Sequence, residues 1–215
     1  MVKDTQKTLI ESYLIARQTV INKGFAPEIN WQESRSLSVL SESEFLEEAA
    51  WVILNTGMRE GIVRRYFPKI SIAFLNWVSA EEIVRNRTSC EAEAVKIFNH
   101  PRKIDAIGSI CEKVAYTGFD IFRENIRVGG VDFLQTLDFI GPITKYHLAK
   151  NVGLDVVKPD RHLVRLTEAA NFKNPRDLCQ TIAEITGDKI SVVDVILWRY
   201  ATLDPQYVAL FQPKD

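Results

Sequence analysis

The chain is poor in cysteine and methionine, and it has no excess of charge of either sign. Its 215 residues include three cysteines and two methionines, and 27 basic side chains stand against 28 acidic ones, giving a formal net charge of -1. Cys90, Cys111 and Cys179 are odd in number and far apart, which argues against a disulfide framework or a Cys-x-x-Cys metal clip. We expect buried thiols in a reducing compartment, and any nucleic-acid surface must come from local charge.

Long apolar runs and alternating strand patterns are also scarce. The first residues, MVKDTQKTLIESYLIARQ, mix charges among apolar positions, which argues against a signal peptide or a membrane span. We therefore expect a soluble, cytoplasmic protein with no membrane partner. Because 46% of the residues are hydrophobic, a chain of this length can bury a core in one domain or in two small lobes.

Apolar residues recur at helical spacing along most of the chain, as at Leu9, Ile10, Tyr13 and Leu14. Start signals divide this pattern into short helices: Ser41 with Glu44 and Ser79 with Glu82 form capping boxes, Ser191 with Asp194 resembles one, and Asn174 precedes Pro175 as a cap. The pattern predicts an all-α fold of about ten helices. Residues 24–43 are polar and lack periodicity, so we expect a long irregular connection there.

The most informative stretch is VDFLQTLDFIGPITKYHLAKNVGLDVVKPDRHLVRL, residues 131–166. It predicts a short apolar helix over Val131–Leu137, a tight turn at Asp138–Gly141 and a second helix from Pro142 to Val152. The start of such a helix presents backbone N–H groups and the positive end of the helix dipole to an anion. Gly141 permits close approach of a phosphate, and Thr144 and Lys145 can add donors beside it.

The charge around this hairpin is locally positive. From Pro142 to Arg165 there are five basic residues and two acidic ones, a local charge of +3 (5 minus 2). The alternative interpretation is a plain helical hairpin with a solvated basic face.

The hairpin and the residues after it resemble the helix-hairpin-helix DNA glycosylase superfamily, the endonuclease III-like enzymes. Leu137–Gly141 (LDFIG) is similar to the turn of the family pattern LPGIGxKTA, and Pro159–Arg165 (PDRHLVR) is similar to its VDxHxxR segment, which holds the catalytic aspartate. The spacing, with HLAKNVG between the two motifs, looks most like the archaeal-type 8-oxoguanine DNA glycosylase branch. Glu48–Met58 and Asp194–Trp198 are weakly similar to the early helix with its wedge loop and to a late helix of that branch.

The resemblance implies base-excision repair of double-stranded DNA. Such enzymes flip a damaged or mispaired base out of the duplex and hydrolyse its N-glycosidic bond, and Asp160 is the expected catalytic carboxylate. From spacing alone Asp160 is better explained as the N-cap of the next helix, and both roles are compatible. The DNA-binding residues implied are Ile140, Gly141, Ile143, Thr144 and Lys145 in the hairpin, His162 and Arg165 after Asp160, and Asn55, Thr56 and Met58 in the wedge loop.

Simpler roles exist for several of these residues. His162 is better explained as a surface or capping residue, which is the more common role of a histidine in the first turn of a helix. Asn55, Thr56 and Met58 can form a helix C-cap around Gly57. Tryptophans at helical spacing are usually core residues, so we assign no base pocket to Trp31, Trp51, Trp77 or Trp198.

The chain departs from the family pattern at two positions of the hairpin. Ile143 stands where bifunctional members have the lysine that forms a Schiff base, and Lys145 lies two residues on, about 200° around the helix. We therefore expect a glycosylase without lyase activity; the alternative is a helix-hairpin-helix DNA-binding protein that has lost catalysis. Phe139 replaces the first hairpin glycine, which weakens the case for close phosphate approach there.

The resemblance also implies the layout and the cofactors. A central bundle, residues 41–152, would end in the hairpin, and residues 1–40 with 153–215 would form a second lobe, with DNA bound across a cleft between them. No iron-sulfur cluster or other metal cofactor is expected, because no cysteines follow Cys179; relatives hold a monovalent cation on the hairpin carbonyls. We expect a monomer, associated with the nucleoid when bound to DNA. A more distant alternative is an all-α interaction module in which the hairpin is only a packing corner.

Overall fold

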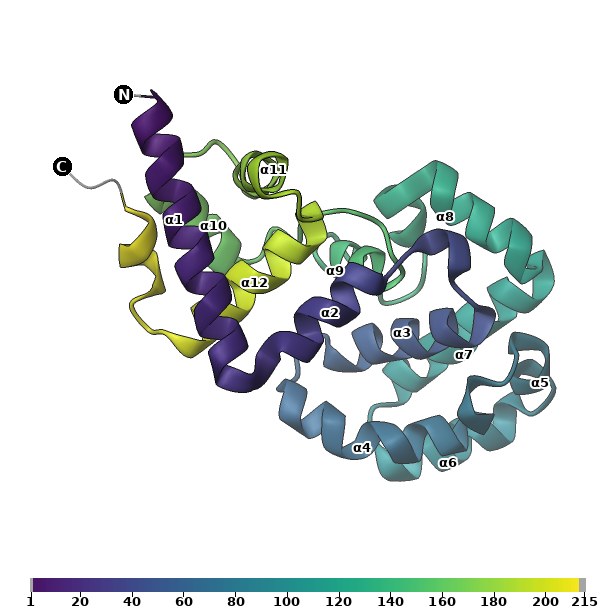
Figure 1. Cartoon of the computed structure of the whole chain (residues 1–215). Helices are drawn as coiled ribbons and strands as arrows, with labels where there is room; N and C mark the ends of the chain where they lie inside the picture. Colours follow the sequence, from purple (N-terminus) through teal and green to yellow (C-terminus); the bar gives the residue numbers. More distant parts are fainter. Residues whose placement is uncertain (1, 213–215) are drawn as a thin grey trace. The chain divides into compact units, whose positions relative to one another are not determined.

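The computed structural model describes residues 2–212, with side chains from residue 6 onward (Figure 1). Within this range every regular element is a helix, which confirms the all-α fold. The chain divides into two compact units: unit 1 comprises the residues up to Arg35 together with those from Gly153, and unit 2 comprises Ser36–Val152. The expected division into DNA-binding lobes stays a prediction.

Unit 1 is built around the apolar helix α12. Its helices are α1 (Val2–Val20), the π-helical turn η1 (Ile21–Phe25), α2 (Ala26–Ser34), α10 (Arg161–Ala169), α11 (Pro175–Thr186), α12 (Ile190–Leu203) and the 3-10 turn η4 (Tyr207–Phe211). Figure 1 shows α1 crossing α12, and the two helices are in contact. Tyr13, Leu166, Ile182, Ile196 and Leu197 are among the side chains buried in the core of this unit.

The long connection expected over residues 24–43 is wrong for most of its length. α1 runs through η1 directly into α2, and the chain turns at Gly24, whose φ of 88° is open to glycine at little cost. Pro27 lies in the first turn of α2, where its missing N–H costs nothing. Only Ile29 and Gln32 of α2 are buried, so the helix has too narrow an inward face to show a periodic apolar pattern.

Unit 2 packs its helices around α3 and α7. Its elements are η2 (Leu37–Val39), α3 (Glu42–Asn55), α4 (Glu60–Ala73), η3 (Leu75–Trp77), α5 (Ala80–Arg85), α6 (Arg87–Ile97), α7 (Pro101–Thr117), α8 (Phe119–Leu134) and α9 (Thr144–Asn151). α3 and α7 contact each other, and α9 packs on both α3 and α8. The largest buried side chains include Phe45, Phe74, Trp77 and Phe122.

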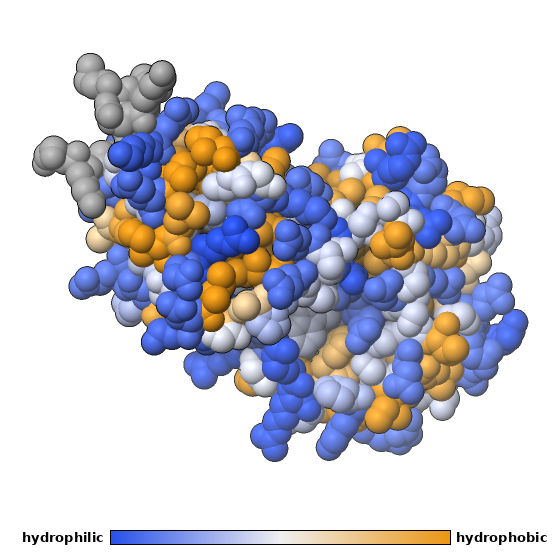
Figure 2. All heavy atoms as spheres, viewed as in Figure 1, coloured by the Kyte–Doolittle hydropathy of each residue, from blue (hydrophilic) through white to orange (hydrophobic). Residues whose placement is uncertain are grey.

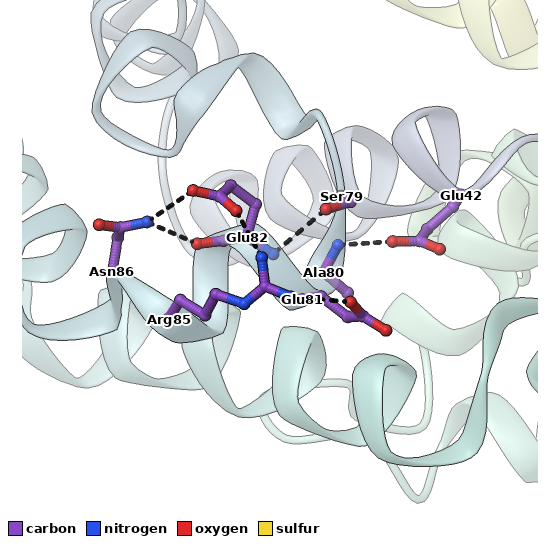
Figure 3. A network of polar contacts seen from close by, with 7 residues as sticks. All are labelled: Glu42, Ser79, Ala80, Glu81, Glu82, Arg85 and Asn86. Carbon is purple, nitrogen blue, oxygen red and sulfur yellow. Dashed lines mark hydrogen bonds and ion pairs between the residues drawn. The ribbon is translucent and has the colours of Figure 1, made fainter.

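The predicted helix caps mostly form. Ser41 and Glu44 make a full capping box, and Asn174 accepts the N–H of Asp177 at the start of α11. Ser79 accepts the N–H of Glu82 at the start of α5, and the Glu42 carboxylate accepts the neighbouring N–H of Ala80 (Figure 3). The box expected at Ser191 with Asp194 is wrong, because α12 begins one residue before Ser191 and both residues bind other partners.

The described surface mixes polar and apolar side chains. Figure 2 shows blue and orange side by side over one face of the chain, and the exposed apolar side chains of α1 include Leu14 and Ile15. None of the helices among the described residues is long and apolar enough to cross a membrane. Cys90, Cys111 and Cys179 are buried thiols and form no disulfide with one another, as the sequence indicates.

Candidate functional site

The segment predicted to form the hairpin lies at the end of unit 2, and both of its helical parts are shorter than expected. Gly130 interrupts α8 with a φ of 54°, and the segment after it ends at Leu134 instead of Leu137. A series of turns follows, in which Ile140 N–H donates to the Leu137 carbonyl at 3.1 Å. The second helix, α9, spans Thr144–Asn151, inside the predicted range.

The start of α9 has two unused amides. Gly141 N–H donates to Thr144 Oγ1 at 2.7 Å, and Lys145 N–H donates to the Gly141 carbonyl at 3.0 Å. Among residues 2–212, no acceptor takes the N–H groups of Ile143 or Thr144. α9 also has no acidic residue in its first turn. Its first turn therefore has room for an external anion at the positive end of the helix dipole.

The hairpin side chains divide into exposed and internal groups. Pro142 is exposed, and Ile143 is 45% exposed. Ile140 is 4% exposed, so any contact from it to a ligand must use its backbone. Lys145 pairs with Asp132, with Nζ 2.8 Å from Oδ1. Lys145 must exchange this partner before it can bind a phosphate.

Phe139, which replaces the family's glycine, sits in left-handed backbone geometry. Its φ is 65°, a conformation that a residue with a Cβ adopts at a cost of about 1 kcal/mol. The Phe139 ring packs edge-on against His100, with 6.0 Å between ring centroids. The contact with His100 offsets the strain and ties the hairpin turn to the residue that precedes α7.

The wedge-loop candidates form the C-terminal end of α3. Asn55 Nδ2 donates to the Trp51 carbonyl and Thr56 Oγ1 to the Val52 carbonyl, each at 2.9 Å. Gly57 follows with a φ of 70°, as in a helix C-cap. Met58 is 38% exposed. The capping role of Asn55 and Thr56 is therefore real, and Met58 is the residue of the three with the most accessible side chain.

Lys103 is a structural residue that the sequence analysis missed. It lies in the first turn of α7, is 2% exposed, and its Nζ donates to the carbonyls of Leu54 at 2.7 Å and Thr56 at 2.6 Å. Burial lowers the pKa of Lys103, because an ammonium loses hydration there. The two carbonyls and the negative end of the α3 dipole offset that loss. A lone lysine in an amphipathic helix carries no sequence signal for such a role.

The first turn of α7 thus connects the wedge loop to the hairpin. Lys103 binds the end of α3, and His100 contacts Phe139 in the hairpin turn. Two exposed arginines flank this connection: Arg59 follows the loop, and Arg102 precedes Lys103. Neither makes an ion pair within the described part of the chain. Candidate residues about 80 positions apart are thereby brought into one region of unit 2, with positive charge beside it.

Asp160 lies in unit 1, at the start of α10. Its Oδ1 accepts the N–H groups of His162 at 2.9 Å and Leu163 at 3.2 Å, so the predicted N-cap is confirmed. Among the described residues no donor reaches Oδ2. The side chain is half-buried. One oxygen is thus held by the helix start while the other remains available.

His162 and Arg165 extend from the same helix. His162 Nδ1 lies 3.3 Å from the hydroxyl of Tyr207, a buried residue of η4. Burial, with help from Arg161 and Arg165, lowers the pKa of His162, although Asp160 opposes this effect. Arg161 and Arg165 are exposed and make no ion pair within residues 2–212. They follow Asp160 by one and five residues.

Other kinds of catalytic group find little support in the described residues. Burial raises the pKa of Cys90, and it raises that of Cys111 to about 12, so neither thiol is an activated nucleophile. No group of three or more His, Cys, Asp or Glu side chains in this part of the chain is placed to hold a metal ion. The polar network at the start of α5 consists of caps and exposed ion pairs (Figure 3).

Comparison of the chain with protein-family models, with curated proteins and with solved structures gives no match. The resemblance therefore rests on the hairpin and on the PDRHLVR segment.

Proposed function

We propose that this protein is a base-excision DNA glycosylase without lyase activity, in which Asp160 is the catalytic carboxylate. The observation that carries the proposal is the state of Asp160: one oxygen is committed to the start of α10 and the other has no donor among the described residues. Two exposed arginines, Arg161 and Arg165, follow it within five residues and make no ion pair with the described residues. A rigid carboxylate next to phosphate-binding charge suits glycosidic bond cleavage in DNA.

The hairpin supplies the backbone contact with DNA in this proposal. The free N–H groups of Ile143 and Thr144 bind one phosphate, and Gly141 has no side chain to obstruct it. Arg59 and Arg102 add positive charge in the same unit. Met58 and Ile143 are exposed apolar side chains that can contact the duplex where a base has been extruded.

Asp160 acts on the extruded nucleotide. As the bond from C1′ to the base breaks, positive charge develops on the sugar, and the Asp160 carboxylate stabilises that charge or orients the attacking water. The water adds to C1′, and the base leaves with the bonding electrons and takes up a proton. The product is free base and an abasic site in an uncut strand.

The lysines of the hairpin region are poorly placed to form a Schiff base. Ile143 occupies the position of the family's nucleophile, and Lys145 is paired with Asp132. Lys103 is buried and bound to two carbonyls. An amine must be exposed and near C1′ to attack it, so we expect hydrolysis without strand cleavage.

The test is single-turnover excision on duplexes that each contain one lesion or mismatch, with and without alkali after the reaction. Alkali cuts the strand at abasic sites, so product seen only after alkali identifies a glycosylase without lyase activity. Trapping with borohydride checks for a Schiff base and should give no covalent adduct. Strand cleavage without alkali would contradict the proposed chemistry at Ile143.

The second candidate is a non-catalytic DNA-binding protein, which the internal cap role of Asp160 favours. Both candidates predict duplex affinity that falls with rising salt. Salt-dependent binding with no excision on any duplex of the panel would favour this second candidate. Absence of binding would reject both and favour the interaction module.

A further inference from the structure

The segment that carries Asp160 has no regular secondary structure of its own. α9 ends at Asn151 and α10 begins at Arg161, and residues 154–160 between them adopt no helical turn. A catalytic carboxylate needs a fixed position, because a displacement of about 1 Å can lower a rate by roughly 10²-fold. The contacts that hold this segment are therefore part of the function of Asp160.

α12 and this segment bind each other through reciprocal carboxylate–amide bonds. Asp155 Oδ1 accepts the N–H of Ser191 at 2.8 Å, in the first turn of α12, where the side chain of the N-cap residue Lys189 does not cap the helix. In the other direction, Asp194 Oδ2 accepts the N–H of Lys158 at 2.6 Å. Asp194 is 1% exposed, so its carboxylate lies on the buried face of α12.

The bonds continue from Lys158 to Asp160. The carbonyl of Lys158 accepts the N–H of Asp160 at 2.8 Å, and Asp160 Oδ1 then accepts the amides of His162 and Leu163. Val157, just before Lys158, is buried in the core of unit 1. A short chain of hydrogen bonds thus runs from Asp194 through the backbone of Lys158 to the start of α10.

We infer that Asp194 is a positioning residue for Asp160 that acts through the backbone of Lys158, an inference that rests on the proposed function of Asp160. Asp194 keeps the segment where Asp160 Oδ1 engages the helix start and Oδ2 stays uncommitted. Without its carboxylate, Lys158 moves away from α12, the cap bonds open more often and Oδ2 loses its fixed direction.

The experiment measures amide hydrogen exchange and excision in the full chain. In Asp194→Ala we expect the amides of His162 and Leu163 to exchange about 10-fold faster, because the cap opens more often. We expect single-turnover excision to fall by about 10²-fold, with duplex affinity changed by less than about 3-fold because no phosphate contact is removed. Asp194→Asn keeps an oxygen acceptor and should restore most of both the protection and the rate. If Asp194→Ala does not fold, Asp194→Ser takes its place. The serine side chain is too short to reach the N–H of Lys158, but it keeps a polar group at this position.

A matched control is Glu42→Ala in unit 2. Glu42 likewise accepts a backbone N–H from a neighbouring element, that of Ala80 at the start of α5 (Figure 3). Its loss should alter neither the exchange of His162 and Leu163 nor the excision rate.

The two readouts separate the inference from the proposed function. Unchanged protection of His162 and Leu163 in Asp194→Ala overturns the positioning role, whatever the excision rate. Lost protection in a protein whose wild type excises no base supports the positioning of Asp160 and rejects the proposed function. An excision rate that stays at the wild-type value when protection is lost overturns the link between position and catalysis.

Discussion

The helices α9 and α10 differ in how their first backbone N–H groups are satisfied. Both helices begin with amides that lack partners inside the helix. In α10 the Asp160 carboxylate takes two of them. In α9 the N-cap residue Ile143 has no side-chain bond, and the amides of Ile143 and Thr144 are unused within residues 2–212. The start of α10 carries its own carboxylate, whereas the start of α9 leaves two amides available to an external anion.

Under the proposed function, this difference separates binding from chemistry. An open helix start can attract a phosphate without a charged side chain, and would contribute affinity. A capped start holds a carboxylate in one orientation, and would contribute the fixed catalytic group.

The largest effect is expected from Asp160→Ala, which removes both the cap and the carboxylate. We expect excision to fall by roughly 10²–10⁴-fold and the free energy of unfolding to fall by about 1 kcal/mol. Asn174→Ala is the matched control, because Asn174 caps α11 in the same way. It should cost similar stability in chemical denaturation and leave excision intact. Equal loss of excision in both variants would mean that Asp160 acts only through stability.

Ile143→Glu should close the open start of α9 with an internal carboxylate. We expect stability to rise by about 0.3–1 kcal/mol, because the charge meets the positive end of the dipole. Duplex affinity should fall by about 10–100-fold, because the carboxylate repels the phosphate. Thermal melting and fluorescence anisotropy measure the two effects.

The control for this change is Ile121→Glu, at the start of α8. Ile121 is 61% exposed, and that turn already contains Asp120. Its duplex affinity should stay close to that of the wild type. A loss as large as that of Ile143→Glu would show that net charge, and not the open helix start, controls binding.

Lys103→Met should loosen the connection between the wedge loop and the hairpin. It leaves the carbonyls of Leu54 and Thr56 without their buried donor, at a cost of about 1–3 kcal/mol in denaturant unfolding. Lys113→Met is the comparison, since Lys113 donates to the Thr136 carbonyl from a position that is 43% exposed. It should change stability by less than about 0.5 kcal/mol. Similar costs for both would contradict a special role for the buried lysine.

Phe139→Gly should change stability little, because two effects oppose each other. The variant relieves strain of about 1 kcal/mol at φ 65° and loses a ring contact with His100 worth about 0.5–1.5 kcal/mol. Phe139→Ala keeps the strain and loses the ring, so it should melt at a lower temperature than Phe139→Gly. The reverse order would show that the backbone at residue 139 is not strained.

The smallest effect concerns pH and His162. Burial lowers its pKa in the folded protein from the ordinary value of 6.5. The unfolded chain therefore binds a proton first as pH falls below 6.5, so stability should decrease there and be fully present above it. His162→Gln should flatten that part of the pH–stability curve. A curve of unchanged slope would show that His162 does not contribute.

Helix caps can be predicted from the sequence, whereas contacts between distant segments cannot. The cap at Asp160 and the box at Ser41 depend on neighbours within three residues, so local patterns reveal them. Lys103 and Asp194 bind backbone groups 36 or more positions away, and no local pattern encodes such partners. The helix α2 was missed because only Ile29 and Gln32 face inward.

The residues around the hairpin also make a contact that the local sequence does not predict. Its turn and second helix follow from Gly141, Pro142 and the apolar periodicity, but the pairing of Lys145 with Asp132 depends on how α9 returns toward α8. That pairing removes one of the phosphate donors that the sequence suggests. Tertiary contacts, and not local propensity, decide which of the expected side chains are available.

The most direct test of the central claim is Asp160→Asn, measured for excision and melting on the same sample. Asparagine caps helices as well as aspartate does, so the change removes the charge and keeps the helix start. The account predicts a melting temperature close to that of the wild type, with excision lowered by roughly 10²–10⁴-fold. Full excision by Asp160→Asn would contradict it and leave Asp160 as a cap alone.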